Sequence, residues 1–276
     1  MTGAGRVQKS IRPPRLEPGA RIGIVSPCYW MRDEPFRRAV GVFEALGYQM
    51  VPGASTRLRE HRFAGTPEQR AADIMAMFED PSIDAIVCAR GGYGGNRVLP
   101  LLDYEAIARH PKIFVGYSDV TGYLTSIGQR AGLVTFHGPL VTTLAKATEK
   151  TIIAMKTALV SDAPLELIPE CGTVIKPGVC SGTLIGGNLT TLCHLVGTSF
   201  EPNFKGKILL IEDVGEMPYR IDRMLTQMKL AGCFNKIAGL ILGTFKECGQ
   251  LNEIVDIFND IFEDLYIPIL EGFEVV

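Results

Sequence analysis

The chain has 276 residues, of which 46% are hydrophobic and 21% are charged, and its formal net charge is −2. This composition is that of a globular protein with one large or two smaller domains, and it excludes disordered and collagen-like chains. The nearly balanced charge, without a basic stripe among aromatic residues, argues against nucleic-acid binding.

No apolar run approaches the ~18 residues that a membrane span requires, so no membrane partner is expected. The first twenty residues are polar and contain proline, and they lack the apolar core of a secretory signal. Cys88 and Cys193 lie in apolar runs and are expected to be small buried side chains. The seven cysteines, which form no CxxC pair and show no regular spacing, stand at positions 28, 88, 171, 180, 193, 233 and 248. An odd number of cysteines without a framework predicts a reducing, cytoplasmic location.

The first half of the chain alternates β-rich runs with amphipathic segments. Strands are expected at 21–26, 48–53, 83–89, 112–117 and 133–139. Helices are expected at 34–47, at 66–80, where Thr66 and Pro67 form the start, and directly after Ser118. This alternation predicts a mostly parallel sheet flanked by helices. In such sheets the chemistry lies at the carboxyl ends of the strands.

Composition changes over residues 161–178, which contain three prolines and no helical period. This stretch indicates a crossover between an N-terminal α/β domain over 1–165 and a smaller C-terminal α/β domain over 166–276. In the second domain, strands are expected at 183–188, 207–213, 237–243 and 266–270, and helices from 189, at 218–232 and at 252–265.

Ser118 directly follows an apolar strand and precedes a helix, in Gly116-Tyr117-Ser118-Asp119. A nucleophile elbow requires this context, because the turn lifts the hydroxyl above the sheet and the helix N-terminus places N–H groups beside it. Only one glycine of the GxSxG pattern is present, since position 120 is valine. Ser118 or Asp119 could instead simply cap the helix. The residues alone leave both interpretations open.

A glycine-rich loop, Arg90-Gly91-Gly92-Tyr93-Gly94-Gly95, follows the third expected strand. Its four glycines allow the backbone to approach a ligand closely and to hold an anion through N–H groups. It matches neither GxGxxG nor a P-loop. An oxyanion hole for a serine on the neighbouring strand and a simple turn both remain compatible with it.

Glu212 and Asp213 end an apolar strand, a position that suits the acid of a Ser–His–acid triad. They could instead cap the following helix, and Glu216 could serve either purpose. The histidines lie at positions 61, 110, 137 and 194 and form no HxH or HExxH pattern, so no metal site is expected. His137 is the best placed, at a strand end, although a structural role in a turn is the simpler interpretation.

Seven segments, in order along nearly the whole chain, resemble the LD-carboxypeptidase family of serine peptidases, which includes the microcin C self-immunity peptidases. They are SP at 26–27, ARGGYG at 89–94, GYSD at 116–119, FHGP at 136–139, GGNL at 186–189, LIEDVGEMPYRIDRML at 210–225 and GLILGTF at 239–245.

The resemblance implies a cofactor-free, homodimeric, two-domain enzyme that cleaves the amide bond between an L- and a D-centre. The family's typical substrate is a murein tetrapeptide, from which the terminal D-alanine is removed during peptidoglycan recycling. By position, the resemblance implies Ser118 as the nucleophile, Glu212 as the triad acid, and the backbone N–H groups of Gly92 and Asp119 as oxyanion donors.

The resemblance further implies a substrate groove between the domains, with Arg90 or Tyr93 near the substrate. The family's triad histidine follows the last strand, in a Gly-Phe-Pro-x-Gly-His-like segment, whereas this sequence reaches Gly272-Phe273 and stops at Val276. The resemblance therefore predicts that the base is missing, through truncation or natural loss. Losing a triad member costs ~10⁴ or more in rate, so we expect little activity from the chain as written.

Two other functions remain open at this point. A self-immunity peptidase would cleave an aminoacyl-nucleotide antibiotic and should present an aromatic side chain to the base, yet the only tryptophan is Trp30. A non-catalytic homologue would bind peptides without cleaving them.

Overall fold

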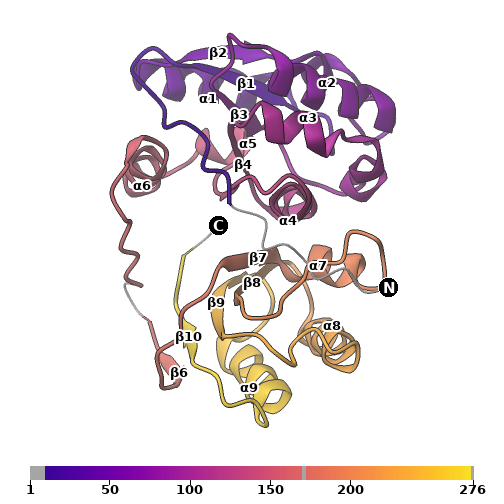
Figure 1. The fold of residues 1–276 in the computed structure, drawn as a ribbon, viewed down its shortest axis with the longest axis vertical. Coiled ribbons are helices and arrows are strands. Elements are labelled where there is room, and N and C mark those ends of the chain that lie inside the picture. The colour runs from indigo at the N-terminus through magenta and orange to yellow at the C-terminus, as the bar shows by residue number, and fades with distance from the viewer. Residues whose placement is uncertain (1–9, 170–171, 275–276) are drawn as a thin grey trace.

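The computed structural model describes residues 10–169 and 172–274. It contains two five-stranded sheets, with strand orders β2-β1-β3-β4-β5 and β6-β10-β9-β8-β7. Figure 1 shows the first sheet and its helices at the top and the second sheet below it. The predicted architecture, a mostly parallel sheet flanked by helices plus a second, smaller α/β part, is confirmed.

The first sheet contains all five strands that the sequence predicts. Its strands are β1 Arg21–Val25, β2 Gln49–Pro52, β3 Ala85–Cys88, β4 Ile113–Gly116 and β5 Phe136–His137. Every neighbouring pair is parallel. Strands β3 and β4 are buried along their whole length, as expected for a sheet covered on both faces.

The helices of this part include three to which the sequence analysis assigned no residue range. The α-helices are α1 Asp33–Ala45, α2 Pro67–Glu79, α3 Tyr104–Arg109, α4 Thr121–Arg130, α5 Val141–Leu144 and α6 Glu149–Val160. Thr66 and Gln69 form a reciprocal capping box at the start of α2, which confirms that predicted start. Helices α3 and α5 are too short to show a period, and α6 exposes Ile153 opposite its buried side chains.

The second sheet is parallel except for the pair β10–β6. Its elements are β6 Val174–Lys176, β7 Leu184–Asn188, α7 Leu189–Leu195, β8 Ile208–Val214, α8 Pro218–Leu230, β9 Gly239–Lys246, α9 Leu251–Phe262 and β10 Ile269–Glu271. Strand β6 lies inside the stretch predicted to be only a crossover, and that prediction was wrong there. Three residues are too few to show an alternating pattern.

The predicted boundary between residues 165 and 166 falls between α6 and β6, in residues that belong to neither sheet. It stays a prediction. Cys171, which the sequence analysis counted, lies outside the described residues. In the part of the chain that the structure describes, no helix is long and apolar enough to cross a bilayer.

The two parts meet where α4 contacts β7 and α7. At this junction the backbone N–H of Asn188 donates to the Thr121 hydroxyl oxygen at 3.0 Å. Asn188 is the last residue of β7 and lies opposite Glu212 of β8, while Thr121 begins α4, three residues after Ser118. The fold therefore brings the ends of β4, β7 and β8 to one interface.

Candidate active site

Ser118 begins a single 3₁₀ turn, Ser118–Val120, between β4 and α4. Its φ angle of 62° lies in the left-handed region, which costs a non-glycine residue ~1–2 kcal/mol. Neither this turn nor α4 has a side-chain cap, so the interpretation of Ser118 or Asp119 as a helix cap was wrong. A strained serine between a strand and a helix has the geometry of a nucleophile elbow.

Gly91 of the glycine-rich loop lies directly against this serine. A Cβ atom at Gly91 would lie 3.0 Å from both Cβ and Oγ of Ser118, and 3.7 Å from the Asp119 nitrogen. The next glycine, Gly92, has a φ of 132°, and a Cβ there would lie 2.5 Å from the Tyr29 ring. The Gly92 N–H donates to no other described residue. The loop thus borders Ser118, while the oxyanion roles of Gly92 and Asp119 stay predictions.

We expect Gly91→Ala to hinder Ser118 while leaving the fold intact. The new methyl group would crowd the serine, whereas the φ of Gly91 lies outside the left-handed region that alanine avoids. Covalent labelling by a fluorophosphonate, followed by intact-protein mass spectrometry, should slow by about tenfold or more. Gly41→Ala in α1 is the control, because its Cβ meets nothing within 4 Å. An unchanged labelling rate in the Gly91 variant would contradict the contact.

The Asp119 side chain fastens the glycine-rich loop to the elbow. Its Oδ2 accepts hydrogen bonds from the Gly95 N–H at 2.8 Å and from the Cys28 thiol at 3.1 Å. Burial raises the pKa of Asp119, and the two donors oppose that rise. The residue after the candidate nucleophile therefore connects three segments: the turn after β1, the loop after β3 and the elbow.

Glu212 is a fully buried carboxylate on β8. Among the described residues, neither of its oxygens has a hydrogen-bond partner. Its pKa is raised to about 8, mainly by burial and also by the Asp213 carboxylate, while the nearby Asn188 amide opposes the rise. The pKa of Tyr117, raised mainly by burial, is raised also by the Glu212 charge. Because Tyr117 directly precedes Ser118, this coupling indicates that the Glu212 carboxylate lies near the elbow.

The two other candidate acids are already engaged. Asp213 accepts from the Asn188 amide at 2.8 Å and from the N–H and hydroxyl of Thr190 at 2.9 and 2.8 Å, so it holds the start of α7. Glu216 pairs with Arg220 at 3.6 Å. Helix α8 begins after Met217 without a side-chain cap, so the capping interpretation of Glu212 and Asp213 was wrong.

His137 lies beside the elbow but does not hydrogen-bond Glu212. It is opposite Gly116 in the β4–β5 register, and its ring centroid is 6.0 Å from that of Tyr117. A Cβ at Gly187 of β7 would come within 3.1 Å of its Nδ1. Among the described residues, no group of three or more histidine, cysteine or acidic side chains could hold a metal ion.

Arg90 and Tyr93 lie on the same loop as Gly91. Tyr93 is half exposed and meets Tyr29 and Phe63 edge to face, with centroids 5.2 and 5.1 Å away. The Arg90 guanidinium lies over the Tyr29 ring at 5.3 Å. These side chains form an aromatic and cationic rim on the loop that borders Ser118, and their predicted role near a substrate stays a prediction.

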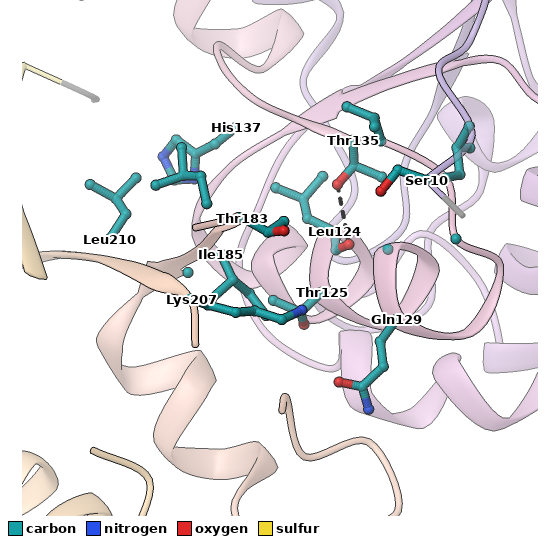
Figure 2. Close-up of a pocket in the computed structure, with 16 residues that line it drawn as sticks. Ser10, Leu124, Thr125, Gln129, Thr135, His137, Thr183, Ile185, Lys207 and Leu210 are labelled. Carbon is teal, nitrogen blue, oxygen red and sulfur yellow. Dashed lines mark hydrogen bonds between the residues drawn. The ribbon is translucent and has the colours of Figure 1, made fainter. Parts of the chain in front are cut away.

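A cavity of about 190 Å³ lies between α4 and β7, where the two parts meet. Figure 2 shows Leu124 and Thr125 of α4 on one side and Ile185 and Lys207 on the other, with His137 at its edge. None of the predicted site residues lines it. His137, which lies beside the elbow, does line it, so the cavity adjoins the surroundings of Ser118 at that side chain.

The sequence analysis missed three residues that assemble this site: Gly91, Thr121 and Asn188. Gly91 and Asn188 lay in segments that were already noted, the glycine-rich loop and GGNL, but no pattern distinguished them from their neighbours. Thr121 had no signal, because its partner Asn188 is 67 residues away in the chain.

Comparison with known proteins gives consistent matches along the chain. Residues 22–138 match the LD-carboxypeptidase N-terminal domain and residues 181–276 its C-terminal domain. The probable murein peptide carboxypeptidase of Bacillus subtilis (strain 168) is 36% identical over 96% of this chain and 86% of its own.

Two solved structures illustrate the range of these relatives. The muramoyltetrapeptide carboxypeptidase from Oxalobacter formigenes has a TM-score of 0.80 and 31% identity, over 92% of this chain and 88% of its own. The microcin C7 self-immunity protein MccF in complex with aspartyl sulfamoyl adenosine has a TM-score of 0.86 and 27% identity, over 95% of this chain and 89% of its own.

Proposed function

Because this chain belongs to the LD-carboxypeptidase family, we propose that it cleaves the L–D amide bond of a murein tetrapeptide and releases the terminal D-alanine. The observation that carries this proposal is the placement of Ser118. Its strained turn borders Gly91 on one side, and on the other the Thr121–Asn188 hydrogen bond connects it to the residue of β7 that lies opposite Glu212.

In the proposed reaction, Ser118 Oγ attacks the scissile carbonyl carbon and gives its proton to an imidazole base. The negative oxygen that results is held by the N–H groups of Gly92 and Asp119. The carbon–nitrogen bond then breaks, and the D-alanine amine leaves with the proton from the base. Water releases the acyl group from Ser118 by the same steps. Arg90 or Tyr93 contacts the substrate at the rim.

Glu212 is the proposed acid, since its buried, unpartnered oxygens suit a cationic imidazole. No described histidine hydrogen-bonds it, so the predicted lack of a base among these 276 residues stays a prediction. After β10 the chain returns toward the first part, where Glu274 lies 3.8 Å from Lys150 of α6. A histidine that follows Phe273, as in the family, would approach the interface from there.

The test compares these 276 residues with the form that includes any residues its reading frame carries after Val276. We expect slow D-alanine release from murein tetrapeptide by the 276 residues, and release about 10⁴-fold faster when a histidine completes the triad. Mass spectrometry measures the product. Tetrapeptide binding by calorimetry without hydrolysis in either form would overturn the proposal and favour a non-catalytic peptide-binding protein.

The aromatic rim favours a second candidate, a self-immunity peptidase that cleaves aminoacyl nucleotides. Tyr93, half exposed against Tyr29 and Phe63, offers a ring on which a base could stack. The relative MccF was crystallised with aspartyl sulfamoyl adenosine. Faster cleavage of that compound than of tetrapeptide, with the gap reduced by Tyr93→Leu, would favour this candidate over the first.

We propose further that the protein is a cytoplasmic homodimer. Apolar side chains exposed around the connection between the two parts support an interface, namely Leu165, Leu167, Ile168, Val174 and Val179. The six described cysteines are all free, which suits a reducing compartment. Light scattering should give twice the chain mass of 30.1 kDa, and cell fractionation should recover the protein with cytosolic markers.

A further inference from the structure

Arg70 of α2 is a fully buried arginine, with 1% of its surface exposed. No carboxylate among the described residues lies within ion-pair distance of it, although buried arginines ordinarily need such a partner. Its guanidinium instead donates to three backbone carbonyls: Pro27 at 2.8 Å, Gly94 at 3.2 Å and Thr66 at 3.4 Å. The side chain therefore hydrogen-bonds to loop carbonyls, and it interacts with the buried Asp119 carboxylate electrostatically, without a direct ion pair.

Two of these carbonyls belong to segments around the nucleophile. Pro27 lies in the turn after β1, where the Tyr123 hydroxyl of α4 also donates to its oxygen at 2.9 Å. Gly94 lies in the glycine-rich loop, three residues after Gly91. Arg70 thus connects both loops to the start of α2, which is itself fixed by its capping box.

The peptide unit between Gly94 and Gly95 is held from both sides. Its carbonyl accepts from Arg70, and its N–H donates to the Asp119 carboxylate at 2.8 Å. Side chains at both positions are excluded, because a Cβ at Gly94 would lie 2.5 Å from Phe63 and one at Gly95 would lie 2.7 Å from Asp119. One cation and one anion therefore fix the orientation of this peptide relative to the elbow.

We propose that Arg70 is a positioning residue for the reaction at Ser118, acting through the Gly94–Gly95 peptide. With that peptide fixed, Gly91 is held against Ser118 Oγ, and the Gly92 N–H stays beside the position where an oxyanion would form. Arginine suits the role because its planar fork carries five donors in a fixed geometry, whereas the lysine ammonium offers three donors from a single nitrogen and methionine offers none. The inference rests on Ser118 being the nucleophile, as proposed above.

The test measures the loop and the serine separately in Arg70→Lys and Arg70→Met. Hydrogen exchange followed by NMR reports the Gly95 amide, and fluorophosphonate labelling reports Ser118. Lys112→Met is the matched control, because Lys112 is also buried and also donates to backbone carbonyls, those of Met77 and Asp80, away from the loop.

We expect the Gly95 amide to exchange at least about tenfold faster in Arg70→Met, and labelling to slow by about 10²-fold, the usual cost of a lost oxyanion donor. Arg70→Lys should lie between this variant and wild type, and remains informative if the methionine variant fails to fold. Lys112→Met should change neither rate beyond its effect on stability.

Unchanged Gly95 exchange in both Arg70 variants would overturn the proposal, and so would faster exchange with unchanged labelling. Labelling is measured in a form whose triad a histidine completes; if wild-type protein of that form is not labelled at Ser118, the nucleophile assignment fails instead. Gly95 exchange alone then decides whether Arg70 holds the loop.

Discussion

Replacing Ser118 by alanine or by glycine is expected to abolish labelling of the protein by a fluorophosphonate. In the form whose triad a histidine completes, either replacement should also lower the rate of D-alanine release about 10⁴-fold or more. In the proposed reaction the hydroxyl is the attacking group, and neither replacement offers another nucleophile in the turn. Intact-protein mass spectrometry over long incubations detects even slow phosphonylation. Labelling that persists in either variant would place the nucleophile elsewhere.

The same pair of variants also measures the strain at this turn. Because the φ of position 118 is 62°, alanine keeps the strain and glycine relieves it. Chemical denaturation should therefore show Ser118→Gly to be more stable than Ser118→Ala by about 1 kcal/mol. Glu247 has a φ of 58° outside the site, and its glycine and alanine variants should show a similar gap with normal labelling. Equal stabilities at position 118 would contradict a strained elbow.

Much of this site was predictable because its chemistry follows from local order along the chain. Ser118 directly follows an apolar run that predicts a strand. The neighbouring strand in the sheet, β3, is directly followed by the glycine-rich loop. Parallel strands place their carboxyl ends on one edge, so the pattern alone brought these two segments together. Thr66 and Pro67 likewise predicted the start of α2, since capping depends only on neighbouring residues.

Contacts between distant segments were not predictable from such patterns. The hydrogen bond between Thr121 and Asn188 joins helix α4 to β7 of the second sheet, and no sequence pattern near either residue predicts it. Arg70 looked like an ordinary charged residue near a helix start, yet it is buried beneath two loops that only the fold brings together. Polar networks of this kind depend on tertiary geometry rather than on composition.

The two adjacent acids on β8 show most clearly what the sequence pattern cannot predict. Successive residues of a strand point to opposite faces, so Glu212 and Asp213 cannot share one role. The sequence could not say which face meets the elbow, and β8 also has a register shift between Ile211 and Asp213. In the structure Asp213 is fully hydrogen-bonded, whereas Glu212 has no hydrogen-bond partner among the described residues.

Glu212→Gln is expected to stabilise the protein at alkaline pH and to have little effect at acidic pH. The pKa of Glu212 is about 8 in the folded protein, against an ordinary value of 4.5. A carboxyl whose folded pKa is raised leaves stability intact below pH 4.5. Stability is then lost progressively between pH 4.5 and 8, as the unfolded chain ionises before the folded one. The loss should approach about 3 to 5 kcal/mol at pH 8.

Urea denaturation at pH 4.5, 6 and 8 measures this difference, because glutamine carries no charge at any of these values. Asp213→Asn on the same strand is compared at pH 4.5, where it should destabilise by about 1.5–3 kcal/mol because charge-assisted hydrogen bonds are lost. At pH 8 its effect should be smaller, because removal of the Asp213 charge also lowers the pKa of Glu212. If the difference in unfolding free energy between wild type and Glu212→Gln does not increase with pH, the raised pKa of Glu212 is contradicted.

The sign of that result bears directly on function. A carboxyl that costs stability when it ionises has no structural reason to be glutamate, whereas an imidazolium beside it would lower its pKa and recover the cost. Adding a histidine beyond Phe273 should therefore reduce the difference in unfolding free energy between the protein with Glu212 and its Glu212→Gln variant at pH 8, if the imidazole reaches the carboxylate. An unchanged difference would show that Glu212 is not the acid of a triad, even if the form with the added histidine is active.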